Sequence, residues 1–133
     1  MDTDAMLGES ADVGIRGELA MPAPVDRAHL ARYTLGDPRL EREILGLFLA
    51  QVPLTIESLR FAATDRAWHV AAHTLKGSCR AVGAGRLARL ALEAEKLGGI
   101  SDEMACRAII GRLEEAATEV EGYVAQAFHE ACA

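Results

Sequence analysis

The chain has 133 residues, a length that suits one compact domain. Half of the residues are hydrophobic but only 5% are aromatic, so a core must be built mainly from aliphatic side chains. That composition favours helix packing and argues against global disorder. The formal net charge of −6 argues against nonspecific binding to nucleic acid or to an anionic membrane surface.

The first 24 residues differ from the rest of the chain. Glycines recur there, no helical apolar stripe is sustained, and acidic residues outnumber the single Arg16, so residues 1–24 are predicted to form a flexible acidic tail. No secretory signal is visible, and no apolar run approaches the ~20 residues that a membrane span needs. We therefore expect a cytoplasmic protein. Its cysteines form no CxxC pair and are expected to be reduced thiols: Cys79, Cys106 and Cys132.

Two helices are predicted in the first half of the folded part. Asp26 can cap a short helix that reaches about Thr34, and Asp37 with Pro38 starts a longer helix over residues 38–60. The helix over residues 38–60 carries two apolar stripes. This indicates either that the helix has neighbours on two sides or that one stripe is partly exposed for a partner. The stripes are Leu40, Ile44, Leu47 and Leu54, and Leu45, Leu49, Val52, Ile56 and Leu59.

Three further helices are predicted, joined by short loops. Thr64 or Asp65 can cap a helix that runs to about Val82, and the next helix covers residues 85–97. Ser101 with Asp102 and Glu103 opens the last helix. Because short loops favour antiparallel neighbours, the predicted fold class is all-α: an up-down antiparallel four-helix bundle over residues 25–133, with a short extra N-terminal helix. The expected buried faces of the last two helices are Leu87, Leu90, Ala94 and Leu97, and Ile109, Leu113, Ala116, Val120 and Ala127.

The helix predicted to end at Val82 has two chemically different sides. At about 100° per residue, its apolar residues share one side, and the opposite side carries Arg66, His69, His73, Lys76, Gly77 and Arg80. His73 lies in the middle of that exposed side, so it is not a core histidine. Gly77 follows one turn later. A glycine there costs about 1 kcal/mol of helix stability relative to alanine, but it clears the surface beside the imidazole.

Other interpretations of this side can be weighed. A solvated polar face without function is open for His73 taken alone, but Lys76 and Arg80 favour an anion or an acidic partner beside the ring. His69 and His73 have the i, i+4 spacing of metal ligands, yet no carboxylate or cysteine shares their side of the helix, so no metal site is predicted. Ser78 is turned away from His73, which argues against a serine hydrolase.

The sequence also resembles a known family. The residues AHTLKGSCRAVGA (72–84) strongly resemble the phosphorylation motif of histidine phosphotransfer (HPt) domains, an H-x-x-K-G core followed by small residues and a glycine. TLGDPRLEREILGLFLAQ (34–51) and RLARLALEAEKLG (86–98) also resemble the flanking helices of bacterial members. The resemblance extends over roughly residues 25–128.

This resemblance implies a phosphorelay intermediate rather than a kinase. His73 would accept a phosphoryl group from a receiver-domain aspartate and pass it to the aspartate of a response regulator, with a hybrid histidine kinase as a further partner. By this resemblance Lys76 would stabilise the phosphorylated site and Gly77 would leave room for the receiver. Arg80 and His69 lie on the same side of the helix and are further candidate supporting residues, with a solvated residue as the alternative for His69. No cofactor is expected on this chain, since Mg²⁺ would lie on the receiver domain. A monomer is expected.

Two alternatives stay open at this point. The chain is either a phosphotransfer protein or a helical adaptor that docks receiver domains without carrying phosphate. A fragment of a dimerising histidine kinase is a further possibility, but a kinase needs an ATP-binding domain with glycine-rich lid motifs, and these 133 residues contain none.

Overall fold

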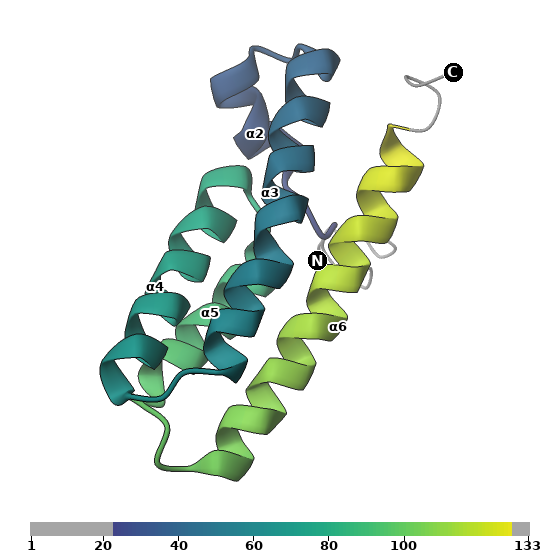
Figure 1. Ribbon diagram of the computed structural model, residues 1–133. Helices are drawn as coiled ribbons and strands as arrows, with labels where there is room; N and C mark the ends of the chain where they lie inside the picture. Colours follow the sequence, from purple (N-terminus) through teal and green to yellow (C-terminus); the bar gives the residue numbers. More distant parts are fainter. Residues whose placement is uncertain (1–22, 129–133) are drawn as a thin grey trace, which may run out of the picture.

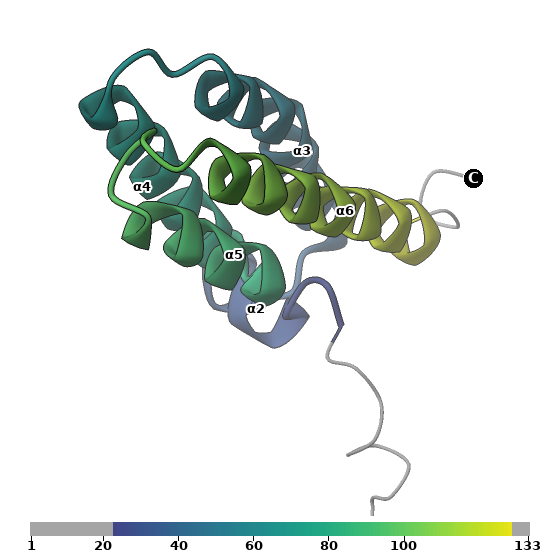
Figure 2. The same ribbon diagram turned by 90° about the horizontal axis from the view of Figure 1, so that it is seen from below.

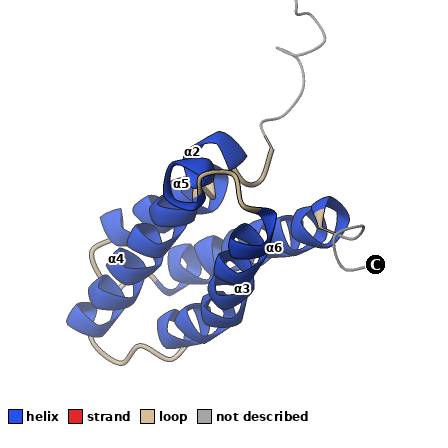
Figure 3. Ribbon diagram, turned by 90° about the horizontal axis from the view of Figure 1, so that it is seen from above, coloured by secondary structure: helices blue, strands red, loops and turns tan. Residues whose placement is uncertain are grey.

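The computed structural model describes residues 23–128, and five α-helices with no strand make up this part (Figure 3). The predicted acidic tail, residues 1–24, lies outside the described residues except for its last two positions, and so does Cys132. The domain boundary at residue 25 stays a prediction. The helices are α2 (Arg27–Thr34), α3 (Pro38–Arg60), α4 (Asp65–Val82), α5 (Gly85–Lys96) and α6 (Glu103–Ala127).

Local capping explains where most of these helices begin. Four of the described helices start at a side chain that accepts a hydrogen bond from a backbone N–H of the first turn: Asp26, Asp37, Thr64 and Asp102. Of the two candidates for α4, Thr64 is therefore the cap. α5 has no side-chain cap, and it begins directly after the turn at Gly83, where φ is 82°. The caps at Asp26 and Asp37 are confirmed as the sequence predicted them. At the start of α6 the cap is Asp102 rather than Ser101.

The four long helices lie side by side around one apolar core (Figures 1 and 2). α4 packs against α3 and α5, and α6 packs against the same two helices. The short α2 contacts α3 and α4 at one end. Trp68 is the largest fully buried side chain, and its indole N–H donates to the carbonyl oxygen of Ala94 at 2.7 Å, which fixes α4 to α5. None of the described helices is long and apolar enough to cross a membrane.

Only one of the two apolar stripes of α3 is buried. Leu45, Val52 and Ile56 belong to the core, whereas Leu47 and Leu54 are 71% and 62% exposed. The choice that the sequence left open is thus decided for partial exposure. The outer stripe of α3 faces solvent at Leu47 and Leu54, while its member Ile44 packs against the core.

Two residues of the predicted buried faces lie elsewhere. Leu97 is 40% exposed, because α5 ends at Lys96 and Leu97 stands in the turn before Gly98. Ala127 is only half-buried, because it is the last residue of α6. The other predicted core positions of α5 and α6 are confirmed as buried: Leu87, Leu90, Ala94, Ile109, Leu113, Ala116 and Val120.

A buried carboxylate joins α2 to α3, and the sequence did not predict it. The side chain of Glu41 is 4% exposed. It accepts from Nη2 of Arg27 at 2.8 Å and from the hydroxyl of Thr34 at 3.1 Å. These two donors satisfy an ionised group that would otherwise be costly to bury. We call Glu41, Arg27 and Thr34 the Glu41 cluster.

Candidate functional site

α4 presents His73 to solvent, as the helical angles predicted. Its opposite side is buried against the core, and the His73 side chain is 65% exposed. His69, Gly77 and Arg80 are exposed as well. The predicted split of this helix into a buried apolar side and an exposed polar side is therefore confirmed for these residues, and the remaining question is what surrounds the imidazole.

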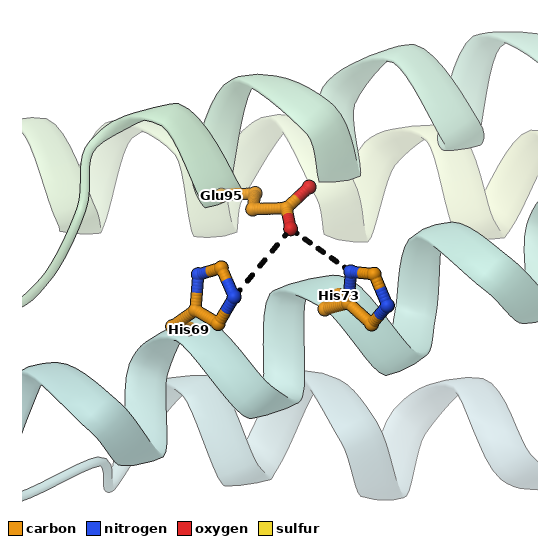
Figure 4. Close-up of side chains that lie close together, drawn as sticks. All are labelled: His69, His73 and Glu95. Carbon is orange, nitrogen blue, oxygen red and sulfur yellow. Dashed lines mark hydrogen bonds and ion pairs between the residues drawn. The ribbon is translucent and has the colours of Figure 1, made fainter.

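A carboxylate from the neighbouring helix α5 lies beside the ring (Figure 4). Oε2 of Glu95 is 2.9 Å from Nδ1 of His73 and 3.7 Å from Nε2 of His69. The ammonium of Lys76 donates to the other oxygen, Oε1, at 2.5 Å. One carboxylate is thus shared by three basic side chains of α4. We call Glu95, His69, His73 and Lys76 the Glu95 cluster.

The short turn between α4 and α5 brings Glu95 to this place. His73 stands eleven residues before Ala84 and Glu95 stands eleven residues after it, so a tight return of the chain puts them at the same level. The turn is closed by a hydrogen bond from the backbone N–H of Ala84 to the carbonyl of Cys79 at 2.9 Å. Glu95 follows the buried Ala94, which places it at the edge of the helix contact.

The electrostatics of the cluster keep Glu95 ionised. The hydrogen bond from Lys76 is the largest effect and that from His73 the second, and together they lower the pKa of Glu95 from 4.5 to about 2 although desolvation acts in the opposite direction. At neutral pH this carboxylate can therefore only accept hydrogen bonds. The hydrogen bond at Nδ1 of His73 then requires the proton on Nδ1. In the neutral ring this leaves the lone pair on Nε2, the nitrogen that Figure 4 shows turned away from Glu95.

Two expectations about this side need correction. Lys76 was expected on the solvent side, but its side chain is only 14% exposed, because the ammonium reaches across to Glu95. The argument against a metal site was that no carboxylate shares the histidine side. That premise is wrong, because Glu95 reaches this side from α5 and was not among the predicted site residues. Reasoning along one helix could not find it. The signal in the sequence that could have identified Glu95 is its spacing, because His73 and Glu95 lie at equal distances along the chain from Ala84.

The surface next to the ring is open. A Cβ atom placed on Gly77 would meet no other atom within 4 Å, so its missing side chain leaves free space one turn after His73. Arg80 is exposed, and its guanidinium makes no hydrogen bond or ion pair with another described residue. His69 stacks on His73, with ring centroids 5.9 Å apart and an interplanar angle of 16°. The two cysteines within residues 23–128 do not take part: Cys79 and Cys106 are buried free thiols, and burial raises the pKa of Cys79 to about 12.

Comparison with protein families shows a match to the Hpt domain over residues 43–123. This match covers more than half of the chain and includes all four members of the Glu95 cluster. The chain belongs to the Hpt domain family. Hpt domains are helical phosphotransfer modules rather than kinases, and they interact with receiver domains and histidine kinases in phosphorelays. Searches of curated proteins and of solved structures gave no match.

Proposed function

We propose that this Hpt protein carries a phosphoryl group on Nε2 of His73, taking it from the aspartate of one receiver domain and passing it to the aspartate of a response regulator. The observation that carries the proposal is the hydrogen bond between His73 and the ionised Glu95, which leaves the lone pair on the exposed nitrogen. A neutral imidazole nitrogen with a free lone pair is a competent nucleophile near pH 7.

The proposed step needs no group on this chain other than those described. The lone pair of Nε2 attacks the phosphorus of an aspartyl phosphate, and the N–P bond forms while the P–O bond breaks and the aspartate leaves as a carboxylate. The ring gains positive charge in this step, and Glu95 stabilises that charge through Nδ1–H. Lys76 and Arg80 offset the charge of the phosphoryl oxygens, and His69 supports the orientation of the ring by stacking. The expected Mg²⁺ belongs to the receiver domain.

We further propose that the receiver docks on apolar residues beside His73, namely Leu47, Leu54 and Val70. Val70 is 49% exposed on α4. His69 and Lys76 mark the side of α4 that meets α5, and Val70 lies on the other flank of His73, toward α3. On α3, Leu49 and Pro53 line a groove shared with α6. At about 100° per residue, Leu47 and Leu54 lie on the other flank of α3, which is the flank toward α4. An apolar strip next to a reactive group is a suitable centre for a protein interface.

The finer points of fold and context are proposals as well. We infer that α3 to α6 form an up-down antiparallel bundle, which the short loops and the pairwise packing of neighbouring helices support. We also propose that the protein acts as a monomer in the cytoplasm. Light scattering of the full chain gives its mass in solution, and the mass of one chain is expected.

The test is phosphoryl transfer from purified, phosphorylated receiver domains of the source organism. We expect label on the wild-type chain that is acid-labile and base-stable, and none on His73→Gln. His29→Gln is the matched control, because His29 lies on α2, away from the Glu95 cluster. Label that persists on His73→Gln would overturn the assignment. Tight receiver binding by a wild-type chain that never takes label would point to the adaptor alternative.

Gly77→Gln is a second arm of the same experiment. The Cβ position is open, so the variant is expected to fold, and its long side chain would stand where the receiver approaches. We expect transfer to slow by about 100-fold, on the scale of a misplaced reacting pair. An unchanged transfer rate would exclude the steric role of this glycine.

A further inference from the structure

We propose that His69, His73 and Glu95 form a binding site for a divalent transition-metal ion of the Zn²⁺ class. Each residue offers one ligand atom, and the three atoms all lie within 4.8 Å of one another. Ligands bonded to zinc at about 2.0–2.1 Å in a tetrahedral site stand roughly 3.3 Å apart. The separations of Oε2 of Glu95 from the two ring nitrogens, 2.9 and 3.7 Å, are close to this value.

The ligand set selects the kind of ion. Two imidazoles with one carboxylate suit Zn²⁺, Cu²⁺ or Ni²⁺, whereas Mg²⁺ and Ca²⁺ prefer oxygen ligands alone. The rings of His69 and His73 are 55% and 65% exposed, so an ion can enter from solvent and keep a water molecule as its fourth ligand. The two rings stand one helical turn apart and already face the same carboxylate oxygen (Figure 4).

Lys76 sets the strength of this site. Its ammonium binds Oε1 of Glu95, so Oε2 stays available to the ion. Its positive charge nevertheless repels a second cation close by, and Arg80 and Arg66 on the same side of α4 act in the same direction. Removal of the charge at Lys76 should therefore tighten metal binding. A site that depended on unspecific surface carboxylates would not single out this lysine.

The consequence for phosphoryl transfer rests on the proposed function of His73. A neutral imidazole has one nitrogen with a free lone pair. An ion on Nδ1 takes that lone pair, and the proton that Nδ1 carried then occupies Nε2. With both nitrogens engaged, the ring has no nucleophile to offer. Bound metal and acceptance of a phosphoryl group thus exclude each other at His73.

Isothermal titration of the full, reduced chain with Zn²⁺ tests the site directly. We expect Zn²⁺ to saturate one site per chain, and we expect no saturable binding when Mg²⁺ is the titrant. Affinity for Zn²⁺ should fall at least tenfold in His69→Gln and in Glu95→Gln, and rise in Lys76→Met. Glu93→Gln is the matched control on α5, because Glu93 pairs with Arg112 on α6 instead of with α4. Circular dichroism checks that each variant folds.

Several results would overturn the site. They are the absence of saturable Zn²⁺ binding, or affinities in His69→Gln and Glu95→Gln that equal that of Glu93→Gln. In the transfer assay, Zn²⁺ should reduce label on the wild type and reduce it less on His69→Gln. If Zn²⁺ binds as described but His73 never takes label, the proposed function fails and the metal site stands. If His73 takes label but the chain binds no Zn²⁺, the metal site fails and the proposed function stands.

Discussion

Two largely buried carboxylates of this protein each accept hydrogen bonds from two side chains, but those donor side chains differ in their exposure to solvent. Glu41 accepts from Arg27 and Thr34, and Glu95 accepts from Lys76 and His73. The side chains of both are largely covered, at 4% and 14% exposure. The difference lies in the donors, because Thr34 is buried and His73 is open to solvent.

The comparison indicates what each cluster is for. The Glu41 cluster ties the short α2 to α3, and no reactive group of it faces outward. The Glu95 cluster also joins two helices, α4 and α5, but it holds an exposed ring in one protonation pattern. We therefore expect changes in the first cluster to act on stability and changes in the second to act on chemistry. The following predictions test that division, from the largest expected effect to the smallest.

Glu41→Ala should destabilise the fold strongly. It leaves the guanidinium of Arg27 without the acceptor Glu41 and leaves the hydroxyl of Thr34 with only the carbonyl of Leu30, at 3.4 Å. Breaking a buried pair costs about 3–5 kcal/mol. Arg27 is 40% exposed, which reduces the expected loss to about 2–3 kcal/mol, a factor of about 30–160 in the folding equilibrium. Urea denaturation measures it. Glu43→Ala, exposed on the same helix, should change the free energy of unfolding by less than about 0.5 kcal/mol.

Glu95→Ala should slow phosphoryl transfer to His73 by about tenfold while the protein stays folded. The ring loses the acceptor that fixes the proton on Nδ1, so less of it carries the lone pair on Nε2, and one hydrogen bond of ordinary strength corresponds to such a factor. Glu95→Gln should recover part of the rate, because its amide oxygen can still accept from Nδ1–H. Single-turnover transfer kinetics distinguish the three proteins. Equal rates would remove Glu95 from the mechanism.

Two glycines test the same division between positions that act on stability and positions that act on chemistry. Gly83 has φ of 82°, and a Cβ atom there would stand 2.9 Å from the backbone oxygen of Asp26, so Gly83→Ala should cost at least about 1 kcal/mol of stability. Gly77 is helical and open, so Gly77→Ala should gain about 0.5–1 kcal/mol. Thermal unfolding of both variants gives the signs. A gain in Gly83→Ala would contradict the close contact between this turn and the start of α2.

The acidity of Glu95 provides the finest test. Its carboxylate has a lowered pKa of about 2, so its stabilising contribution is complete above about pH 4.5 and is lost as the pH falls toward 2. Because the hydrogen bond from Lys76 is the largest cause, Lys76→Met should raise the pKa of Glu95 toward 4.5. Carbon-13 NMR of the carboxyl carbon follows the titration. An unchanged midpoint in the variant would assign the low pKa to another source.

The sequence predicted the features that depend on neighbours along one helix. The caps at Asp26 and Asp37, the buried side of α4 and the exposure of His73 all follow from local spacing, and all are confirmed. The prediction was wrong at Leu97, where the helix ends one residue earlier than the apolar pattern suggested. It also missed the Glu41 and Glu95 clusters, because each depends on how two helices pack and a pattern within one helix contains no information about that.

The firm attachment of α4 bears on how a partner would recognise the state of this protein. Trp68 is anchored to Ala94, and Leu75 and Cys79 are fully buried behind the ring of His73. A phosphoryl group on that ring would add negative charge to a surface whose backbone has little freedom to respond. The two states would then differ in electric field and hardly in shape. Discrimination between them by a receiver should weaken as added salt screens charges over about 8–10 Å.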